Sequence, residues 1–139
     1  MDIILASKSS KTLLQSINKL LPQLSALAKP LSETELIDII DSNQLLLATE
    51  EKEIYGMLSL VTCTLPTGKK ALIEDLVVDN SVRGRGIGKM LLNKAIELAK
   101  SKELRHIDLT SNPLRKEANA LYQKLGFKKR ETNVYRIHL

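Results

Sequence analysis

Apolar and polar positions follow each other along the chain with two spacings, one typical of helices and one of strands. The apolar run 2–6 predicts a first strand, and residues 8–21 repeat apolar positions with helical spacing. Pro22 is expected to close that helix, because proline cannot donate the next hydrogen bond. Ser32 followed three residues later by Glu35 forms a capping box, which predicts that a second helix begins there.

Three strands are predicted next, over residues 44–49, 54–64 and 71–78. Charged residues 50–52 separate the first two, and the turn residues 66–68 separate the second from the third. Short turns favour antiparallel pairing of the strands that they join, so most of the sheet is expected to be antiparallel.

The second half of the chain begins with a glycine turn and a helix behind it. That helix is predicted to run for about fifteen residues with one apolar stripe, made by Ile87, Leu91, Ala95 and Leu98. A strand over residues 105–110 follows, and then a helix that Asn112 caps and Pro113 opens. Gly126 is expected to end this helix, because glycine is the usual residue just past a helix C-cap.

Two closing strands are predicted at residues 127–130 and 133–139. The complete order, β-α-α-β-β-β-α-β-α-β-β, indicates a single domain over residues 1–139. The predicted fold class is α/β in the α+β sense. It is a mixed, mostly antiparallel sheet of about six to seven strands with helices on both faces.

Charge is distributed unevenly along the chain. Residues 1–82 carry seven Lys or Arg and eleven Asp or Glu, a net charge of −4, whereas residues 83–139 carry fourteen and five, a net +9. A basic half attracts polyphosphates, including nucleic acid. One Phe, three Tyr and no Trp leave few rings to stack on bases, which favours a phosphorylated small molecule as the ligand. The single cysteine agrees with a reducing cytoplasm, and no apolar run approaches the length of a membrane span.

The glycine turn is the clearest candidate for a phosphate site. The strand that ends at Val78 leads into the run Arg83-Gly84-Arg85-Gly86-Ile87-Gly88-Lys89. The first N–H groups of a helix lack intrahelical partners, and the helix dipole adds partial positive charge to them. Glycines let the backbone approach a phosphate closely. The turn is therefore predicted to hold a phosphate or a pyrophosphate.

Two motifs resemble the GNAT superfamily of N-acetyltransferases. Residues 83–88, which follow Val77-Val78, match that family's R-x-x-G-x-G/A signature for acetyl-CoA, and residues 118–127 resemble its A-x-x-L-Y-x-x-x-G-F segment. The motifs occur in the family's order and at about its usual separation. The resemblance implies an acetyl-CoA-dependent N-acetyltransferase, which moves an acetyl group to a primary amine by direct attack in a ternary complex.

The same resemblance assigns the acetyl-CoA contacts to backbone groups. The pyrophosphate would lie on the N–H groups of Arg83, Gly84, Arg85, Gly86, Ile87, Gly88 and Lys89. The pantetheine arm would pair with Leu76, Val77 and Val78, along a slot that a strand bulge opens in the family. The N–H of Leu76 or Val77 would polarise the thioester carbonyl, as an oxyanion hole does.

Tyr122 is the expected general acid, because the resemblance places a tyrosine beside the sulfur of coenzyme A. The departing thiolate gains from a nearby proton donor. Tyr122 lies one residue off the apolar stripe of its helix, which agrees with a ring at the edge of the core. A tyrosine that serves only in packing is the alternative.

Glu74 and Asp75 interrupt an otherwise apolar strand and are the candidates for the base. Side chains of a strand alternate, so the two carboxylates face opposite ways, and a buried carboxylate without a partner costs free energy. At least one is therefore expected to face the acceptor, and Glu74 is favoured. By resemblance, some aminosugar-phosphate acetyltransferases carry the same pair. A water-relayed base and a purely structural ion pair are the alternatives.

Arg115 stands where many members of the family have an asparagine that contacts the pantetheine. Arginine cannot accept a hydrogen bond, so Asn112 or Asn119 is expected to replace that contact.

Three other functions compete with this N-acetyltransferase. They are a nucleic-acid-binding module that uses the basic half, a coenzyme A sensor without catalysis and, ranked last, a dinucleotide-binding oxidoreductase. The glycines at 84, 86 and 88 do not fit the G-x-G-x-x-G pattern of that last class. No metal is expected, because His106 and His138 lack the spacing of ligands. The expected partner is a small-molecule or peptide amine, with neither nucleic acid nor membrane, and a homodimer stays open.

Overall fold

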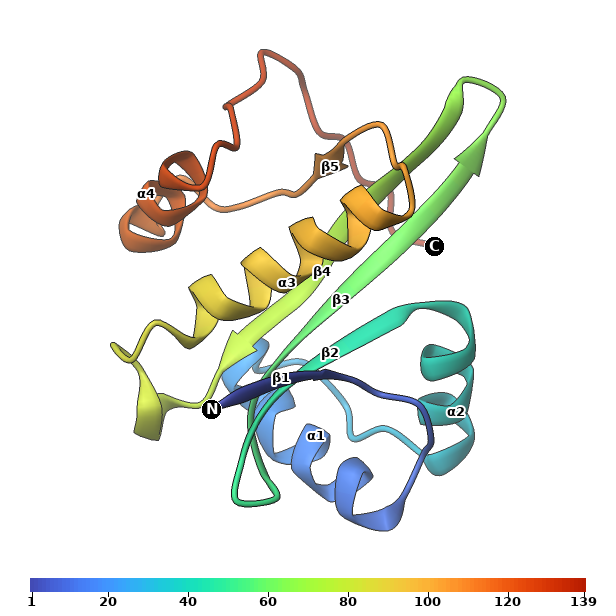
Figure 1. Cartoon of the computed structure of the whole chain (residues 1–139), viewed down its shortest axis with the longest axis vertical. Coiled ribbons are helices and arrows are strands. Elements are labelled where there is room, and N and C mark those ends of the chain that lie inside the picture. Colours follow the sequence, from blue (N-terminus) through green and yellow to red (C-terminus); the bar gives the residue numbers. More distant parts are fainter. The chain divides into compact units, whose positions relative to one another are not determined.

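All residues, 1–139, are described by the computed structural model of the chain, and they fall into two units, Met1–Leu109 and Thr110–Leu139. The first unit contains all the strands and most of the helices (Figure 1). In chain order its elements are β1 (Asp2–Leu5), α1 (Lys11–Leu24), α2 (Glu33–Ser42), β2 (Gln44–Glu50), β3 (Glu53–Leu65), β4 (Gly68–Val78), the 3₁₀ turn η1 (Asn80–Val82), α3 (Ile87–Ser101) and β5 (Ile107–Asp108). The second unit contains α4 (Lys116–Lys124) and the segment after it.

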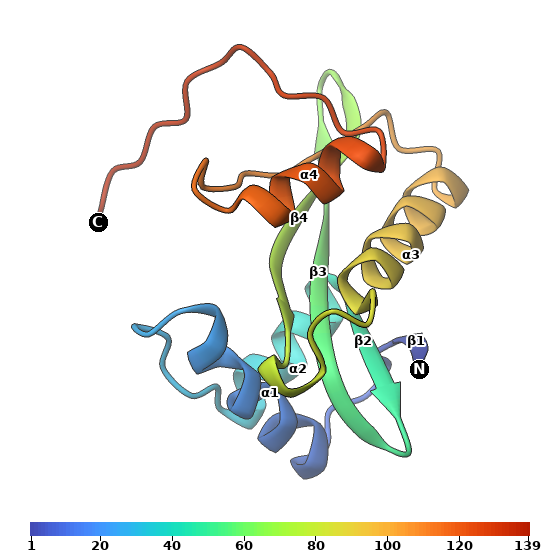
Figure 2. The ribbon, with the colours of Figure 1, turned by 90° about the vertical axis from the view of Figure 1, so that its left-hand side faces the viewer.

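The first unit is built on a five-stranded sheet in the order β1-β2-β3-β4-β5. The first four strands are antiparallel to their neighbours, and β5 pairs parallel to β4. Residues 45–48 of β2 are buried in succession, which requires cover on both faces of the sheet. Figure 2 shows α1 and α3 on opposite sides of β3 and β4. The mixed, mostly antiparallel sheet with helices on both faces is therefore confirmed.

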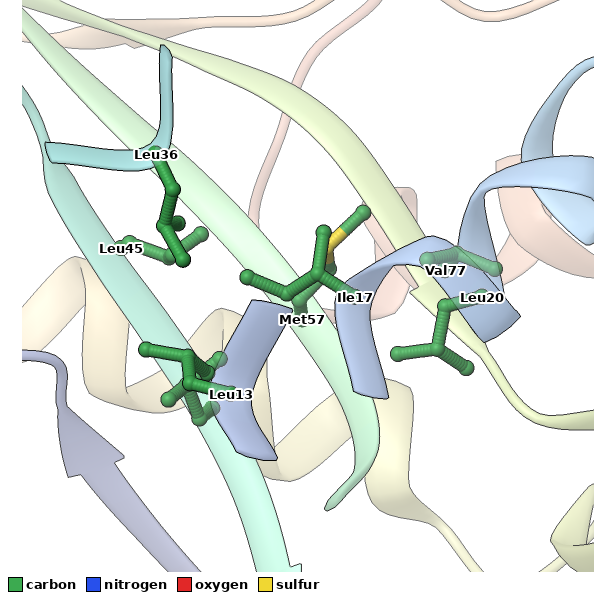
Figure 3. Close-up of a cluster of buried hydrophobic side chains, with 8 residues drawn as sticks. Leu13, Ile17, Leu20, Leu36, Leu45, Met57 and Val77 are labelled. Carbon is green, nitrogen blue, oxygen red and sulfur yellow. The ribbon is translucent and has the colours of Figure 1, made fainter. Parts of the chain in front are cut away.

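One layer of the core lies between the sheet and α1 with α2 (Figure 3). Its buried members are Leu13, Ile17, Leu20, Leu36, Leu45, Leu47, Met57 and Val77. Burial of a large aliphatic side chain is worth about 1.5–3 kcal/mol, so this cluster holds both N-terminal helices on the sheet. On the other face, the predicted stripe of α3 is confirmed at Ile87, Leu91 and Ala95, which are buried.

Helix starts in the first unit are set by local side-chain caps. The capping box is confirmed, because Ser32 Oγ accepts from Glu35 N at 3.2 Å and Glu35 Oε1 accepts from Ser32 N at 3.2 Å. The first helix begins later than predicted, at Lys11, because Ser10 Oγ caps it by accepting from Leu13 N at 3.1 Å. A cap of this kind is worth about 1 kcal/mol.

The prediction that Pro22 closes α1 is wrong, since the helix continues to Leu24 with Pro22 inside it. A proline inside a helix removes its own N–H bond and crowds the carbonyl four residues earlier, here that of Asn18, but its fixed φ is compatible with a helix, so other contacts can offset the cost. Leu21 and Leu24 both pack against the core cluster, so the apolar face favours one more turn.

The predicted number of strands, about six to seven, is wrong in two places. Residues 127–130 and 133–139 form no strand, because no neighbouring strand completes a hydrogen-bond ladder with them, and residues 128–139 are exposed. The strand predicted at 105–110 is reduced to Ile107–Asp108, because pairing with β4 ends at Leu72.

In the second unit, the predicted start of the helix at Asn112 and Pro113 is wrong. Asn112 Oδ1 accepts from Leu114 N at 2.9 Å and so stabilises a turn, and α4 begins only at Lys116. The C-terminal end is as predicted. Gly126 has φ 101°, its N–H donates to Gln123 O at 3.1 Å, and Phe127 N donates to Tyr122 O at 3.0 Å. These are the two bonds of a Schellman ending.

Candidate active site

A bulge in β4 lies where Glu74 and Asp75 interrupt the apolar pattern. Met57 of β3 pairs with Val77 and Ser59 pairs with Glu74, so Asp75 and Leu76 together face the single residue Leu58. Asp75 has φ 51°, in the left-handed region that favours glycine. A non-glycine residue there carries strain of about 1–3 kcal/mol, which surrounding structure must offset. The bulge also breaks strict alternation, so the reasoning that Glu74 and Asp75 must face opposite ways does not apply here.

Around and after the bulge, one edge of β4 pairs with no strand of the first unit, and we call this the open edge. β5 pairs only with Ala71 and Leu72, so β4 from Ile73 to Val78 has β3 as its one strand neighbour. Asp79 N donates to Tyr55 O at 2.8 Å, toward β3. Strand N–H groups alternate in direction, and those of Val78 and Leu76 are therefore directed to the open edge. An extended ligand can pair there as an added strand does.

The glycine turn then leads into α3. Gly84 has φ 83° and Gly86, the N-cap, has φ 76°, so both need the conformational freedom of glycine. A Cβ at either position would meet nothing within 4 Å, so the turn is open on that side. No side chain caps α3, and Met90 N is the first to bond back, to Gly86 O at 3.1 Å. The N–H groups of Ile87, Gly88 and Lys89 are thus free to hold an anion.

The two arginines of the turn have different partners. Arg85 Nη2 donates to Glu50 Oε1 at 3.0 Å, and Arg85 Nη1 donates to Glu50 Oε2 at 3.3 Å. The hydrogen bonds from Arg85 lower the pKa of the half-buried Glu50 carboxyl, and the same bonds raise the pKa of Arg85. Arg83 Nε donates to Val78 O at 3.4 Å, which leaves most of its guanidinium exposed. Arg83 is therefore freer than Arg85 to meet a phosphate.

Asp79 fixes the start of the turn, a role that none of the sequence motifs predicted. It is the one buried charged side chain, 6% exposed, and it accepts from Ser81 N at 2.9 Å and Ser81 Oγ at 2.8 Å. The hydrogen bond from the Ser81 backbone, and next that from its hydroxyl, lower the pKa of Asp79. An aspartate at the end of a strand often accepts a hydrogen bond from the backbone two residues later, which is an Asx turn. The sequence could therefore have predicted the turn at Asp79.

Asn80 and Lys19 connect the same turn to α1. Asn80 N donates to Gln23 Oε1 at 2.8 Å, and Lys19 Nζ lies 4.0 Å from Asp79 Oδ2. These contacts join α1 to the chain just ahead of the glycines.

A pocket of about 80 Å³ adjoins the bulge on the α1 and α2 face of the sheet. Its lining is apolar except for Ser59 and Asp75, and comprises Ile17, Leu21, Leu31, Leu36, Ile39, Leu45, Met57, Ser59 and Asp75. No hydrogen bond or ion pair of the chain engages the Asp75 carboxylate, and Glu74, also exposed, is absent from the lining. The structure thus brings Asp75, rather than the favoured Glu74, to a pocket.

In the second unit, Tyr122 is 7% exposed and its ring packs edge-on against Phe127, with ring centroids 6.1 Å apart at 68°. Asn119 Nδ2 donates to Asn112 O at 3.0 Å, so these two predicted residues contact each other. Arg115, at the N-cap of α4, has an exposed side chain. The predicted residues thus gather in two groups, one in each unit.

No group of three or more His, Cys, Asp or Glu side chains is arranged to hold a metal ion. None of the helices has the length and apolar character to cross a bilayer.

Residues 14–127 match the model of the "Acetyltransferase (GNAT) family". A glucosamine 6-phosphate N-acetyltransferase of Trypanosoma brucei brucei is 32% identical over 123 residues, covering 75% of this chain and 76% of that protein. An uncharacterized N-acetyltransferase of Methanocaldococcus jannaschii is 44% identical over 61 residues, 44% of this chain and 27% of that protein. The chain therefore spans about a quarter of one relative and three quarters of the other.

A crystal structure of a Trypanosoma brucei acetyltransferase superposes with a TM-score of 0.81 at 31% identity, covering 99% of this chain and 100% of that chain.

Proposed function

The chain belongs to the acetyltransferase (GNAT) family, a family of acyltransferases, and from that premise we propose that it transfers an acetyl group from acetyl-CoA to a primary amine by direct attack in a ternary complex. The observation that carries the proposal is a continuous stretch of the first unit. A bulged strand with an open edge, residues 73–78, runs directly into an open glycine turn and an uncapped helix N-terminus.

Backbone groups of that stretch hold acetyl-CoA in this proposal. The free N–H groups at the start of α3, with those of residues 83–86, bind the pyrophosphate, and the α3 dipole favours its negative charge. The pantetheine pairs with the open edge of Leu76, Val77 and Val78. Of the two N–H groups predicted for this role, those of Leu76 and Val77, that of Leu76 is directed to the open edge, and in this proposal it donates to the thioester carbonyl and stabilises the oxyanion that forms on attack.

Asp75 and Glu74 are the proposed bases. The ammonium of the acceptor loses a proton to one of them, directly or through a water, and the free amine attacks the carbonyl carbon. The unpaired carboxylate of Asp75 in the pocket lining makes it the better candidate, and it stands one residue before the Leu76 N–H.

Tyr122 is the proposed general acid. As the C–S bond of the tetrahedral intermediate breaks, the Tyr122 hydroxyl gives its proton to the thiolate. The nitrogen, which became positively charged on attack, loses its extra proton to solvent, and solvent restores the proton of Tyr122. The edge-on contact with Phe127 supports the role, because it limits the rotation of the ring. Asn112 or Asn119 is proposed to bind the pantetheine. The Nδ2 of Asn119 donates to Asn112 O, and no group of the chain donates to the Oδ1 of Asn119.

The test follows thiol release and product together. The protein is mixed with acetyl-CoA and a panel of primary amines, and free coenzyme A and acetylated amine are both counted. We expect one thiol for each acetylated amine. A protein that binds coenzyme A in calorimetry but releases no thiol with any amine would support the sensor instead. A salt-dependent gel shift with nucleic acid, and no binding of coenzyme A, would support the nucleic-acid module.

A further inference from the structure

The lining of the pocket beside the bulge is apolar apart from Asp75 and Ser59. Its residues come from α1, α2, β2, β3 and β4 and from Leu31 between α1 and α2, and Figure 3 shows Ile17, Leu36, Leu45 and Met57. One anionic group at the border of an aliphatic surface matches a ligand with one cationic and one aliphatic part. We propose that the acceptor is a primary amine on a short aliphatic group, rather than a phosphorylated aminosugar. This proposal rests on the proposed function and names the substrate class of its acceptor site.

Charge around the pocket agrees with a cationic ligand. The lining contains no Lys, Arg or His, and Asp75 is its one ionisable side chain. The helix α2, which lines the pocket through Leu36 and Ile39, has four acidic residues and no basic one. Such a surface attracts an ammonium and repels a phosphate.

The lining also discriminates against sugars. A sugar hydroxyl that enters an aliphatic pocket loses its hydrogen bonds to water, and Ser59 is the one hydroxyl there to replace them. An alkyl group loses no hydrogen bond and gains about 0.8 kcal/mol for each methylene buried.

Size limits the aliphatic part. The pocket measures about 80 Å³, and an apolar cavity of about 150 Å³ is known to hold benzene. A chain of a few carbons therefore fits better than a ring. With its ammonium at Asp75, the nitrogen of such an amine lies beside the residue that precedes Leu76, and so near the proposed oxyanion donor.

The kinetic test compares matched acceptors at saturating acetyl-CoA. Ethylamine, propylamine and butylamine measure the gain for each methylene, and 1,4-diaminobutane, glucosamine and glucosamine 6-phosphate measure the cost of polar groups. We expect kcat/KM to rise about fourfold for each added methylene, until the pocket is filled. We expect kcat/KM for diaminobutane and for both sugars to be at least about tenfold lower than kcat/KM for butylamine. A kcat/KM for glucosamine 6-phosphate equal to or higher than that for butylamine would overturn the proposal.

Two variants of α2 test whether the gain in kcat/KM from added methylenes arises in this pocket. Ile39→Ala removes a lining side chain, whereas Ile37→Ala makes the same change at a position that is 44% exposed and outside the lining. Ile39→Ala is expected to reduce the preference for butylamine over ethylamine about fourfold, and Ile37→Ala to leave it unchanged. If the preference for butylamine over ethylamine is the same in both variants, the alkyl group binds outside this pocket, and the proposal is overturned.

A binding measurement separates this proposal from the proposed function. Butylamine and glucosamine 6-phosphate are titrated into the protein with coenzyme A present, and protection against thermal unfolding is followed. If no amine is acetylated but butylamine protects the protein and Ile39→Ala weakens that protection, the proposed function fails and the pocket assignment stands. If amines are acetylated but glucosamine 6-phosphate protects and butylamine does not, the pocket assignment fails alone.

Discussion

The glycine turn, residues 83–89, and the pocket beside Asp75 are built in different ways. The turn is one continuous segment whose binding groups are backbone N–H groups, and two glycines with positive φ give it its shape. The pocket collects side chains from five elements between Ile17 and Asp75, and its one charged residue sits at a strained position of a bulge. A ligand common to a whole family can be held by backbone, because the backbone tolerates sequence change. Side chains can then determine which acceptor reacts.

Substitution of Tyr122 is expected to cause the largest loss of kcat. It tests whether catalysis requires a residue outside the glycine turn and the pocket. Tyr122→Phe removes the proposed proton donor and keeps the ring. We expect kcat to fall about 100-fold or more, with the Kd for acetyl-CoA within about twofold of the original. Stopped assays of thiol release and calorimetry measure the two quantities. Unchanged kcat would remove the acid role from Tyr122.

Asp75→Asn tests the pocket side of the comparison. We expect kcat/KM for the amine to fall about 100-fold, because the variant loses the proposed base and the partner of the ammonium. Glu74→Gln is the matched control, one residue away and outside the pocket lining, and is expected to cost less. A larger loss of kcat/KM in Glu74→Gln than in Asp75→Asn would indicate that Glu74 is the base. A weaker affinity for acetyl-CoA in Asp75→Asn would contradict the separation of the two regions.

Gly86→Val tests the turn. A β-branched residue at φ 76° costs about 1–2 kcal/mol, so the turn must shift and displace its N–H groups. We expect acetyl-CoA to bind at least about tenfold more weakly, with the KM for the amine nearly unchanged. Gly68→Val is the control, since Gly68 also has a positive φ, 121°, in the turn between β3 and β4. Equal losses of acetyl-CoA affinity in both variants would show general destabilisation rather than a lost binding site.

Asp79 gives the smallest effect and tests how the turn is anchored. Its pKa is lowered in the folded state, so its contribution to stability is present above the unfolded pKa, about 3.9, and is lost as pH falls through the folded pKa. We expect Asp79→Ala to lose about 1 kcal/mol of unfolding free energy at pH 7. Urea unfolding at pH 7 and pH 3 should show that difference shrink at pH 3. A difference of the same size at both pH values would contradict the charged cap.

The features that the sequence predicts well are those with local causes. The Ser32 and Glu35 capping box, the glycine turn and the Gly126 ending each depend on residues within a few positions of one another. The stripe of α3 is local in the same way. Helix caps and turns follow from the chemistry of one or two side chains.

The rest depends on partners distant in the chain. Residues 127–139 have strand-forming composition but no neighbouring ladder, and β5 has only two residues, which pair with Ala71 and Leu72 of β4. The left-handed conformation of Asp75 has no local signal, because the bulge arises from its register against Met57 and Ser59. Alternation along a regular strand therefore favoured Glu74, and only the register and the pocket lining point to Asp75.

Direct transfer between a bound donor and a bound acceptor can be tested with a matrix of initial rates in which acetyl-CoA and butylamine are both varied. We expect double-reciprocal lines that intersect, because both substrates must be bound before the acetyl group moves. Parallel lines, together with an acetylated protein after incubation with acetyl-CoA alone, would contradict it by showing a covalent intermediate.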